Sequence, residues 1–194
     1  MNLIIRNERI EEYDEVEKMT REAFWNVYKP GCDEHLMLHQ LRQSKEFVKE
    51  LDFVAECDGK IVGNIICSKC SVKNDDAHTE NNEDVICIGP IGVLPEYQKK
   101  GIGAMLMKQA IDHARQMQFK GIVLYGNPEF YHKFGFVNAK HYDLSTPQNT
   151  NFEEFMALEL TPGSLQTISG RCYESKAFEI QPDELEAFEQ RFQS

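Results

Sequence analysis

A strand, a glycine-bearing turn and a helix follow one another over residues 85–115, and this order constrains the fold more than any other stretch. Residues 85–93 read VICIGPIGV, the apolar and β-branched run typical of a buried strand. Gly101 and Gly103 follow, and without a Cβ they let the backbone turn tightly beside a ligand. The helix after them exposes unpaired amides and a positive end, which suit a phosphate. Its apolar residues recur at helical spacing: Met105, Leu106, Ala110, Ile111 and Ala114.

The glycines do not match the two commonest nucleotide motifs. A P-loop requires Gly-Lys followed by Ser or Thr, and that sequence occurs nowhere in the chain. A dinucleotide fingerprint requires a third glycine three residues after Gly103, where Leu106 stands instead. The remaining pattern is Gln98-x-x-Gly101-x-Gly103-Ala104, with positive charge nearby on Lys99, Lys100 and Lys108.

This pattern after a strand resembles the acetyl-CoA pyrophosphate loop of the GCN5-related N-acetyltransferases (GNAT), which reads Gln/Arg-x-x-Gly-x-Gly/Ala. A second hallmark of that family is a short helix with an aromatic-Tyr pair, followed by x-x-Leu/Phe-Gly-Phe. Residues 130–136, FYHKFGF, are similar to it, with Asn127 as the predicted N-cap, Pro128 in the first turn and Gly135 as the stop. The Gly-Asn-Pro sequence, the helix start at Glu34 and the long C-terminal tail resemble the YhbS-type branch.

The resemblance implies an α/β (α+β) GNAT fold: a mixed, mostly antiparallel sheet, splayed at strand four and flanked by helices. We expect one domain over residues 1–194, with a core of about 3–145 and a C-terminal extension of about 146–194, because this length suffices for a single full core. Strands are expected at residues 3–6, 52–56, 60–72, 85–93, 121–125, 155–160 and 170–175, and helices at 10–28, 33–43, 104–115 and 182–192.

Local signals support several of these elements. Asp58-Gly59 between two apolar runs predicts a tight hairpin. The helix over residues 10–28 is expected to bury Val16, Met19, Ala23, Phe24 and Val27 and to end before Pro30-Gly31. Residues 73–84 are polar and acidic, which predicts an exposed, mobile loop. In the family, the two helices after the first strand line the acceptor cleft, so this segment is expected to determine acceptor selectivity.

The resemblance also assigns the cofactor contacts. The pantetheine arm would pair with Ile91 and Val93, and Gly89, Pro90 and Gly92 would help open the sheet beside them. The backbone N–H of Val93 or its neighbour would polarise the thioester oxygen, an effect typically of about 10² to 10³ in rate. The expected cofactor-binding residues are Ile91, Gly92, Val93, Gln98, Lys99, Lys100, Gly101, Ile102, Gly103, Ala104, Asn127 and Tyr131.

Tyr131 is the expected general acid. A tyrosine has an ordinary pKa of about 10 and a thiol one of about 8.5, so a phenol retains a proton to give at neutral pH as a CoA thiolate forms. The alternative role for Tyr131 is packing under the cofactor. The base that deprotonates the amine is left open among Glu34, His35, His39, Glu83 and Asp84.

The charged-residue composition narrows the classes of partner that the protein could bind. The formal net charge is −11, which disfavours nucleic acid and anionic membranes and favours a cationic small substrate, although the same acidity can serve only to keep the protein dissolved. The N-terminus has neither a signal-peptide nor an anchor pattern, and with six cysteines in a chain lacking an export signal we expect a reducing, cytoplasmic setting.

The sequence does not favour three more specific sites: a metal site, a paired-cysteine site and an aromatic box. No metal is expected, because His35 and His39 lack the Glu of a zinc-binding HExxH motif. Cys67 and Cys70 are three apart on a strand, which directs their thiols to opposite faces. Phe24, Trp25 and Tyr28 could form an aromatic box for a cation, but helical spacing predicts core positions.

The expected activity is therefore direct transfer of acetyl from acetyl-CoA to a primary amine, without an acyl-enzyme. The alternative is a non-catalytic acyl-CoA-binding module. Polyamines, aminoglycosides, amino acids and protein amines all stay open as acceptors, and the oligomeric state stays open too, a homodimer included.

Overall fold

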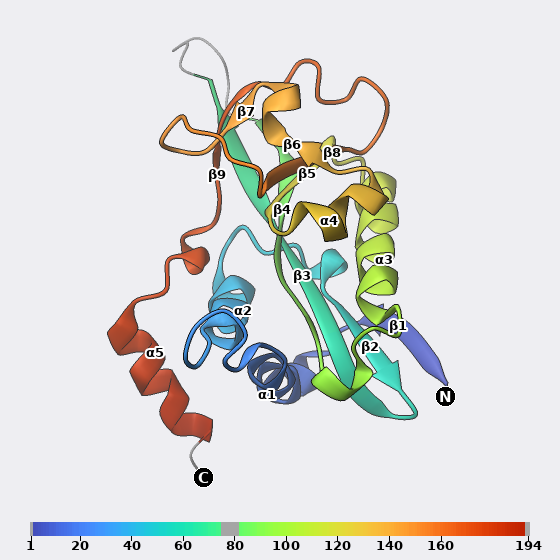
Figure 1. The fold of residues 1–194 in the computed structure, drawn as a ribbon, viewed down its shortest axis with the longest axis vertical. Helices are drawn as coiled ribbons and strands as arrows, with labels where there is room; N and C mark the ends of the chain where they lie inside the picture. The colour runs from blue at the N-terminus through green and yellow to red at the C-terminus, as the bar shows by residue number, and fades with distance from the viewer. Residues whose placement is uncertain (1, 75–81, 193–194) are drawn as a thin grey trace. The chain divides into compact units, whose positions relative to one another are not determined.

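The computed structural model describes residues 2–74 and 82–192 (Figure 1). The chain forms two compact units. The first unit comprises residues 1–67, 89–110 and 176–194, and the second comprises residues 68–88 and 111–175. Two long strands and one helix pass from one unit into the other, so each unit is assembled from segments that are distant in sequence.

The first unit is built on antiparallel strands. β1 pairs with β2 and β2 with β3, and β4 is the next strand after β3. The β2–β3 connection has Asp58 at φ 50° and Gly59 at φ 86°, the two left-handed residues of a tight hairpin, which confirms the prediction. The strands are β1 (Leu3–Asn7), β2 (Phe53–Cys57), the first part of β3 (Lys60–Lys73) and the last residues of β4 (Asn82–Val93).

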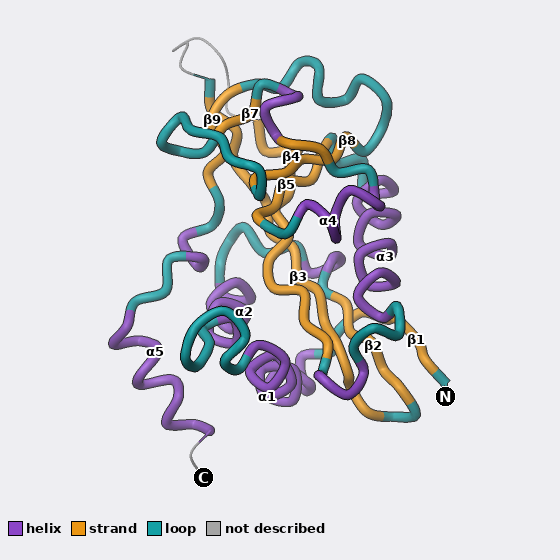
Figure 2. Tube along the Cα trace, in the orientation of Figure 1, coloured by secondary structure: helices purple, strands orange, loops and turns teal. Residues whose placement is uncertain are grey.

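The helices of the first unit include one that ends earlier than predicted. α1 ends at Phe24 because Asn26 adopts φ 59° and accepts a hydrogen bond on its side chain from the Gly31 amide at 2.8 Å. Figure 2 shows the resulting loop before α2. The expectation of a helix to Tyr28 is wrong, and Val27 is 56% exposed rather than buried. The helices are α1 (Tyr13–Phe24), α2 (Glu34–Gln43), the first part of α3 (Ile102–Gln116), α5 (Pro182–Glu189) and the short turns η1 (Ile10–Glu12), η2 (Lys49–Leu51), η3 (Pro95–Tyr97), η6 (Lys176–Phe178) and η7 (Gln190–Phe192).

Two glycines of β4 let α1 and α2 lie close to this strand. A Cβ on Gly92 would lie 3.1 Å from a Phe24 ring carbon, and one on Gly89 would lie 3.0 Å from Leu41 Cδ1. Both distances are shorter than normal side-chain contacts, so larger residues would push the helices away. The last turn of α1 is thereby held against the strand that is expected to bind the cofactor.

The second unit holds two parallel pairings, β4 with β5 and β7 with β9. Val85–Cys87 of β4 pair with Gly121–Val123 of β5, whereas β4 continues to Val93 and β5 to Tyr125. β5 is antiparallel to β8 and β8 to β6, while β9 pairs with the end of β3 and with β7. The chain is thus a mixed, mostly antiparallel sheet with helices, as predicted. The elements are β5 (Gly121–Tyr125), α4 (Pro128–Tyr131), η4 (His132–Phe134), β6 (Val137–Asn138), η5 (Ala139–Tyr142), β7 (Leu144–Ser145), β8 (Phe155–Glu159) and β9 (Gly170–Tyr173).

The remaining expectations have mixed outcomes. The helix predicted for residues 182–192 is present as α5 followed by the tighter turn η7. Residues 75–81 of the loop predicted over residues 73–84 lie outside the described residues. Residue 73 belongs to β3 and residues 82–84 belong to β4, so the loop prediction is wrong at these positions. The structure divides into two compact units, and a single domain over residues 1–194 stays a prediction. Among the described residues, no helix combines the length and apolar character needed to cross a bilayer.

Candidate active site

The turn between β4 and α3 has the strained geometry that its glycines predict. Lys99 adopts φ 59° and Gly101 φ 85°, and the Met105 amide donates to the Gly101 carbonyl at 3.0 Å to begin α3. The preceding amides, from Ile102 to Ala104, belong to the helical turn that has no earlier carbonyl to bond. This part of the first unit therefore has the positive helix end that typically favours an anion.

Gln98 holds the turn to the strand. Its side-chain Nε2 donates to the Val93 carbonyl at 3.0 Å, while Lys100 Nζ donates to the Glu96 carbonyl at 2.8 Å. Lys99 and Lys100 are both exposed. The side chain of Gln98 thus orders the end of β4, and the lysines leave positive charge at the surface of the turn.

The predicted cofactor residues divide between the units. Residues 91–104 lie in the first unit, where Ile91 and Val93 are half-buried and Gly92 is buried. Asn127 and Tyr131 lie in the second unit.

Tyr131 is closely packed in the second unit. Asn127 caps α4 by accepting from the Glu129 amide at 2.9 Å, and Gly135 ends the following turn at φ 92°, as predicted. The ring of Tyr131 lies directly on Gly126, where an added Cβ would come within 2.2 Å of Cε2. Gly126 is therefore a packing requirement for the tyrosine.

His35 is enclosed by the C-terminal helix. Its side chain has no exposed surface, and Nε2 lies 2.8 Å from Glu189 Oε1. The rings of Phe188 and Phe192 lie 5.4 and 5.3 Å away. Burial lowers the pKa of His35 to about 4, although the nearby Glu189 carboxylate opposes this shift. His35 is turned toward α5 and is neutral near pH 7.

The other base candidates also have structural partners. His39 Nδ1 lies 2.7 Å from Glu17 Oε1, and Asp84 pairs with Lys120 at 2.9 Å. Glu34 accepts from the Asp33 amide at 3.1 Å, and burial raises its pKa. Glu83 belongs to β4, but its side chain lies outside the described residues. The residue that deprotonates the acceptor amine is therefore not assigned, and a general base stays a prediction.

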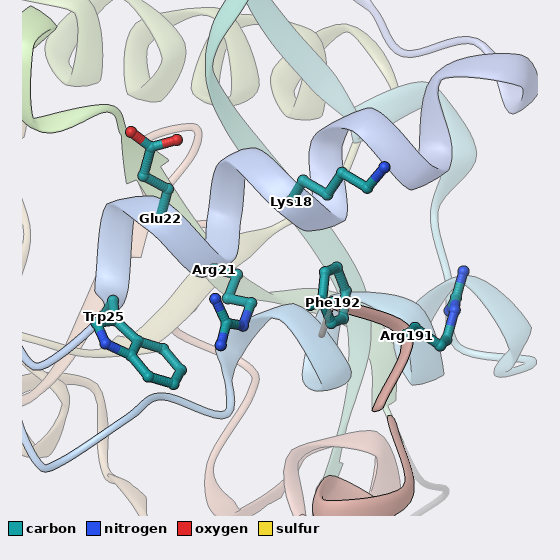
Figure 3. A pocket seen from close by; sticks show the side chains of 6 residues that line it. All are labelled: Lys18, Arg21, Glu22, Trp25, Arg191 and Phe192. Carbon is teal, nitrogen blue, oxygen red and sulfur yellow. The ribbon is translucent and has the colours of Figure 1, made fainter. Parts of the chain in front are cut away.

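A pocket of about 650 Å³ opens beside α1 in the first unit (Figure 3). Arg21 lies 3.9 Å above the Trp25 ring and also pairs with Glu189 at 2.7 Å. Arg191 pairs with Asp14 at 2.8 Å, so both guanidinium groups are already neutralised. The lining residues are Lys18, Arg21, Glu22, Trp25, Arg191 and Phe192.

The aromatic residues after α1 do not form core. Trp25 is 42% exposed and Tyr28 is 79% exposed, so the core prediction is wrong for both. The physical reason is the early end of α1, which removes Trp25 and Tyr28 from the helical face that packs inward.

Two polar residues that lie in or beside strands, Asn64 and Glu174, were not predicted from the sequence. Asn64 in β3 is fully buried, accepts from Thr20 Oγ1 at 3.1 Å, and has no partner for Nδ2 within residues 2–74 and 82–192. A lone polar residue inside the apolar run 61–67 was the available signal. Glu174 gives no such signal, because its position depends on the pairing of β9.

The described residues contain no group of three or more His, Cys, Asp or Glu side chains arranged for a metal ion. All six cysteines are buried, and none of them forms a disulfide.

Comparison with known proteins decides the family. The model of the acetyltransferase (GNAT) family matches residues 14–136, well over half of the chain. The chain belongs to this family. The prediction that the chain is an acetyltransferase and the predicted resemblance to YhbS are both confirmed.

Individual relatives agree with this membership. The Escherichia coli K12 N-acetyltransferase YjhQ is 29% identical over 86 residues, which cover 44% of this chain and 45% of YjhQ. YhbS of the same organism is 25% identical over 135 residues, or 69% of this chain and 76% of YhbS.

Solved structures show the same fold. The structure of Escherichia coli YhbS in complex with CoA has a TM-score of 0.79 at 22% identity and covers 93% of each chain. A GNAT family acetyltransferase from Brucella melitensis in complex with acetyl-CoA has a TM-score of 0.72 at 26% identity, covering 91% of this chain and 98% of its own.

Proposed function

We propose that this acetyltransferase moves acetyl from acetyl-CoA directly to a primary amine. The observation that supports this most is the turn at Gly101, whose φ of 85° opens α3 as an anion site directly after β4. The similar YhbS and Brucella melitensis proteins were solved with CoA and with acetyl-CoA. In this proposal the pyrophosphate binds the amides of residues 98–104, and Lys99 and Lys100 add charge.

The proposed acetyl transfer then needs few groups of the protein. The pantetheine arm pairs with Ile91 and Val93, and the Val93 N–H stabilises the oxygen of the tetrahedral intermediate. The neutral amine attacks the thioester carbon, the C–N bond forms and the C–S bond breaks. Tyr131 gives its proton to the CoA thiolate and regains one from the nitrogen. No acyl-enzyme forms in this sequence.

The acceptor is proposed to be a cationic amine. The formal charge of −11 attracts ammonium groups over long distances. The first unit also places α1 directly against β4 through Phe24 and Gly92, so side chains of α1 are candidates for acceptor selectivity.

The test is release of CoA thiol from acetyl-CoA in the presence of polyamines, aminoglycosides, amino acids and peptides. We expect release with at least one amine, and a rate about 10² to 10⁴ lower for Tyr131→Phe than for wild type at equal acetyl-CoA affinity. Tyr142→Phe, a half-exposed tyrosine of η5, serves as the control. Binding of acetyl-CoA without release for any amine would instead identify a non-catalytic acyl-CoA module, and an unchanged rate in Tyr131→Phe would contradict the assigned acid.

A further inference from the structure

The pocket beside α1 lies on the side of that helix that is turned away from β4. Val16, Thr20 and Ala23 are buried together on the opposite side of α1. That buried side faces β4, because an added Cβ on Gly92 would come within 3.5 Å of Ala23 Cβ. Helical spacing places the four lining residues of α1 and its C-cap on the outer side: Lys18, Arg21, Glu22 and Trp25. The pocket is therefore separate from the strand that is expected to bind acetyl-CoA.

The second wall of the pocket comes from η7, and ion pairs hold it against α1. Arg191 and Phe192 line the pocket from this turn. Arg191 donates to Asp14 at 2.8 Å and to Glu17 at 3.2 Å, and both acceptors belong to α1. The two walls are thus in place before a ligand arrives, which lowers the ordering cost of binding.

The cations of α1 retain hydrogen-bond donors for a ligand. Glu189 accepts from Nε of Arg21 at 3.0 Å and from Nη2 at 2.7 Å, which occupies one edge of the guanidinium. Within residues 2–74 and 82–192, Nη1 of Arg21 has no partner, and Lys18 forms no ion pair. Because Lys18 and Arg21 are three apart, they are neighbours on the helix surface. The outer side of α1 therefore offers a free ammonium beside unused guanidinium N–H groups.

Two aromatic rings complete the lining. Trp25 is 42% exposed, and the Arg21 guanidinium lies 3.9 Å above its ring. The ring of Phe192 lies 5.5 Å from the same guanidinium and is half-buried. Arg21 thus joins two apolar surfaces within one pocket, and these surfaces suit the apolar body of a ligand.

Glu22 restricts the charge that the ligand carries. Among the described residues that line the pocket it is the only acidic one, and Figure 3 shows its carboxylate pointing away from Arg21 and Trp25. Arg21 and Arg191 are each paired with a carboxylate already, which leaves Lys18 as the uncompensated cation of the pocket. One negative charge matches this balance better than a polyphosphate does.

We propose that this pocket binds a monocarboxylate with an apolar body. The carboxylate lies on Lys18 and on the unused N–H groups of Arg21, whose planar edge matches a carboxylate, and the body covers the Trp25 and Phe192 rings. The site is distinct from the proposed acetyl-CoA site and does not depend on the proposed acetyl transfer.

Trp25 is the only tryptophan of the chain, so its fluorescence reports on this pocket directly. The full-length protein is titrated with phenylpropionate and with phenylpropionamide, which has the same body without the charge. We expect a saturable change in Trp25 fluorescence with phenylpropionate and binding of the amide that is weaker by about tenfold or more. Saturating acetyl-CoA should leave the affinity for phenylpropionate unchanged.

Lys18→Gln removes the free ammonium at an exposed position, so this variant is expected to fold. Its affinity for phenylpropionate should fall by about threefold or more. Lys45→Gln, at a side chain that is 92% exposed, should bind as wild type does. The proposal would be overturned by a Trp25 signal that does not change, by equal affinities for the acid and the amide, by an unchanged affinity in Lys18→Gln, or by displacement with acetyl-CoA.

Discussion

His35 illustrates how burial decides what a titratable side chain can do. Its neighbour Cys32 lies 3.4 Å from Nδ1, and Glu189 closes the other side of the ring. From the sequence, His35 and His39 were two of the candidate bases on the helix expected at residues 33–43. In the structure their face of the helix is covered by Phe188, which lies 4.9 Å from the His39 ring, and no property of residues 34–43 alone indicates this.

The depressed pKa of His35 predicts how stability depends on pH. The folded chain holds the neutral imidazole down to about pH 4, whereas the unfolded chain protonates it near the ordinary pKa of about 6.5. Below about pH 6.5 the unfolded chain therefore binds more protons, and stability falls as the pH is lowered from 6.5 toward 4. His35→Gln removes this contribution.

Urea unfolding at pH 7.5 and pH 5 measures the effect. The midpoint of wild type should fall more over this range than that of His35→Gln, since all other titrating groups are shared. His141→Gln, at an exposed position of η5, should retain the dependence of wild type. A parallel fall in wild type and His35→Gln would contradict the account of this site.

Secondary-structure elements were predictable where a local rule fixes them. The Asp58-Gly59 hairpin, the Asn127 cap and the Gly135 stop depend on residues within a few positions of each other, and each is found as predicted. The end of α1 was not predictable in this way. Asn26 adopts its left-handed conformation together with a hydrogen bond from Gly31, a closure that helical periodicity cannot indicate.

The turn at Gly101 offers a matched pair of glycines. Gly101 at φ 85° and Gly59 at φ 86° both have open space where a Cβ would be, so Gly→Ala imposes the same backbone strain of about 1–2 kcal/mol at each. The proposed function separates them. Gly101→Ala should weaken acetyl-CoA binding at least tenfold in a calorimetric titration, because the turn must place its amides against the pyrophosphate.

Gly59→Ala, in the β2–β3 hairpin, should lose a similar amount of stability and keep the acetyl-CoA affinity of wild type. Equal affinities in both variants and wild type would show that the Gly101 turn does not hold the cofactor.

Contacts between segments that are far apart in the chain could not be predicted from the sequence. Arg21 and Glu189 are 168 positions apart, and their ion pair joins the C-terminal helix to α1. Glu174 reaches Cys87 across 87 positions. The fold class and the family followed from two short motifs, whereas these pairings depend on the folded arrangement of each unit.

In the proposed reaction, the acetyl group passes from acetyl-CoA to a primary amine in one step. Mass spectrometry of a reaction that contains acetyl-CoA, the amine panel and the protein measures both products and protein. We predict an amine heavier by one acetyl group, in proportion to the CoA thiol released, while the protein keeps its unmodified mass throughout turnover. An acetylated protein that forms and decays at the rate of turnover, or the absence of any acetylated amine, would contradict the claim.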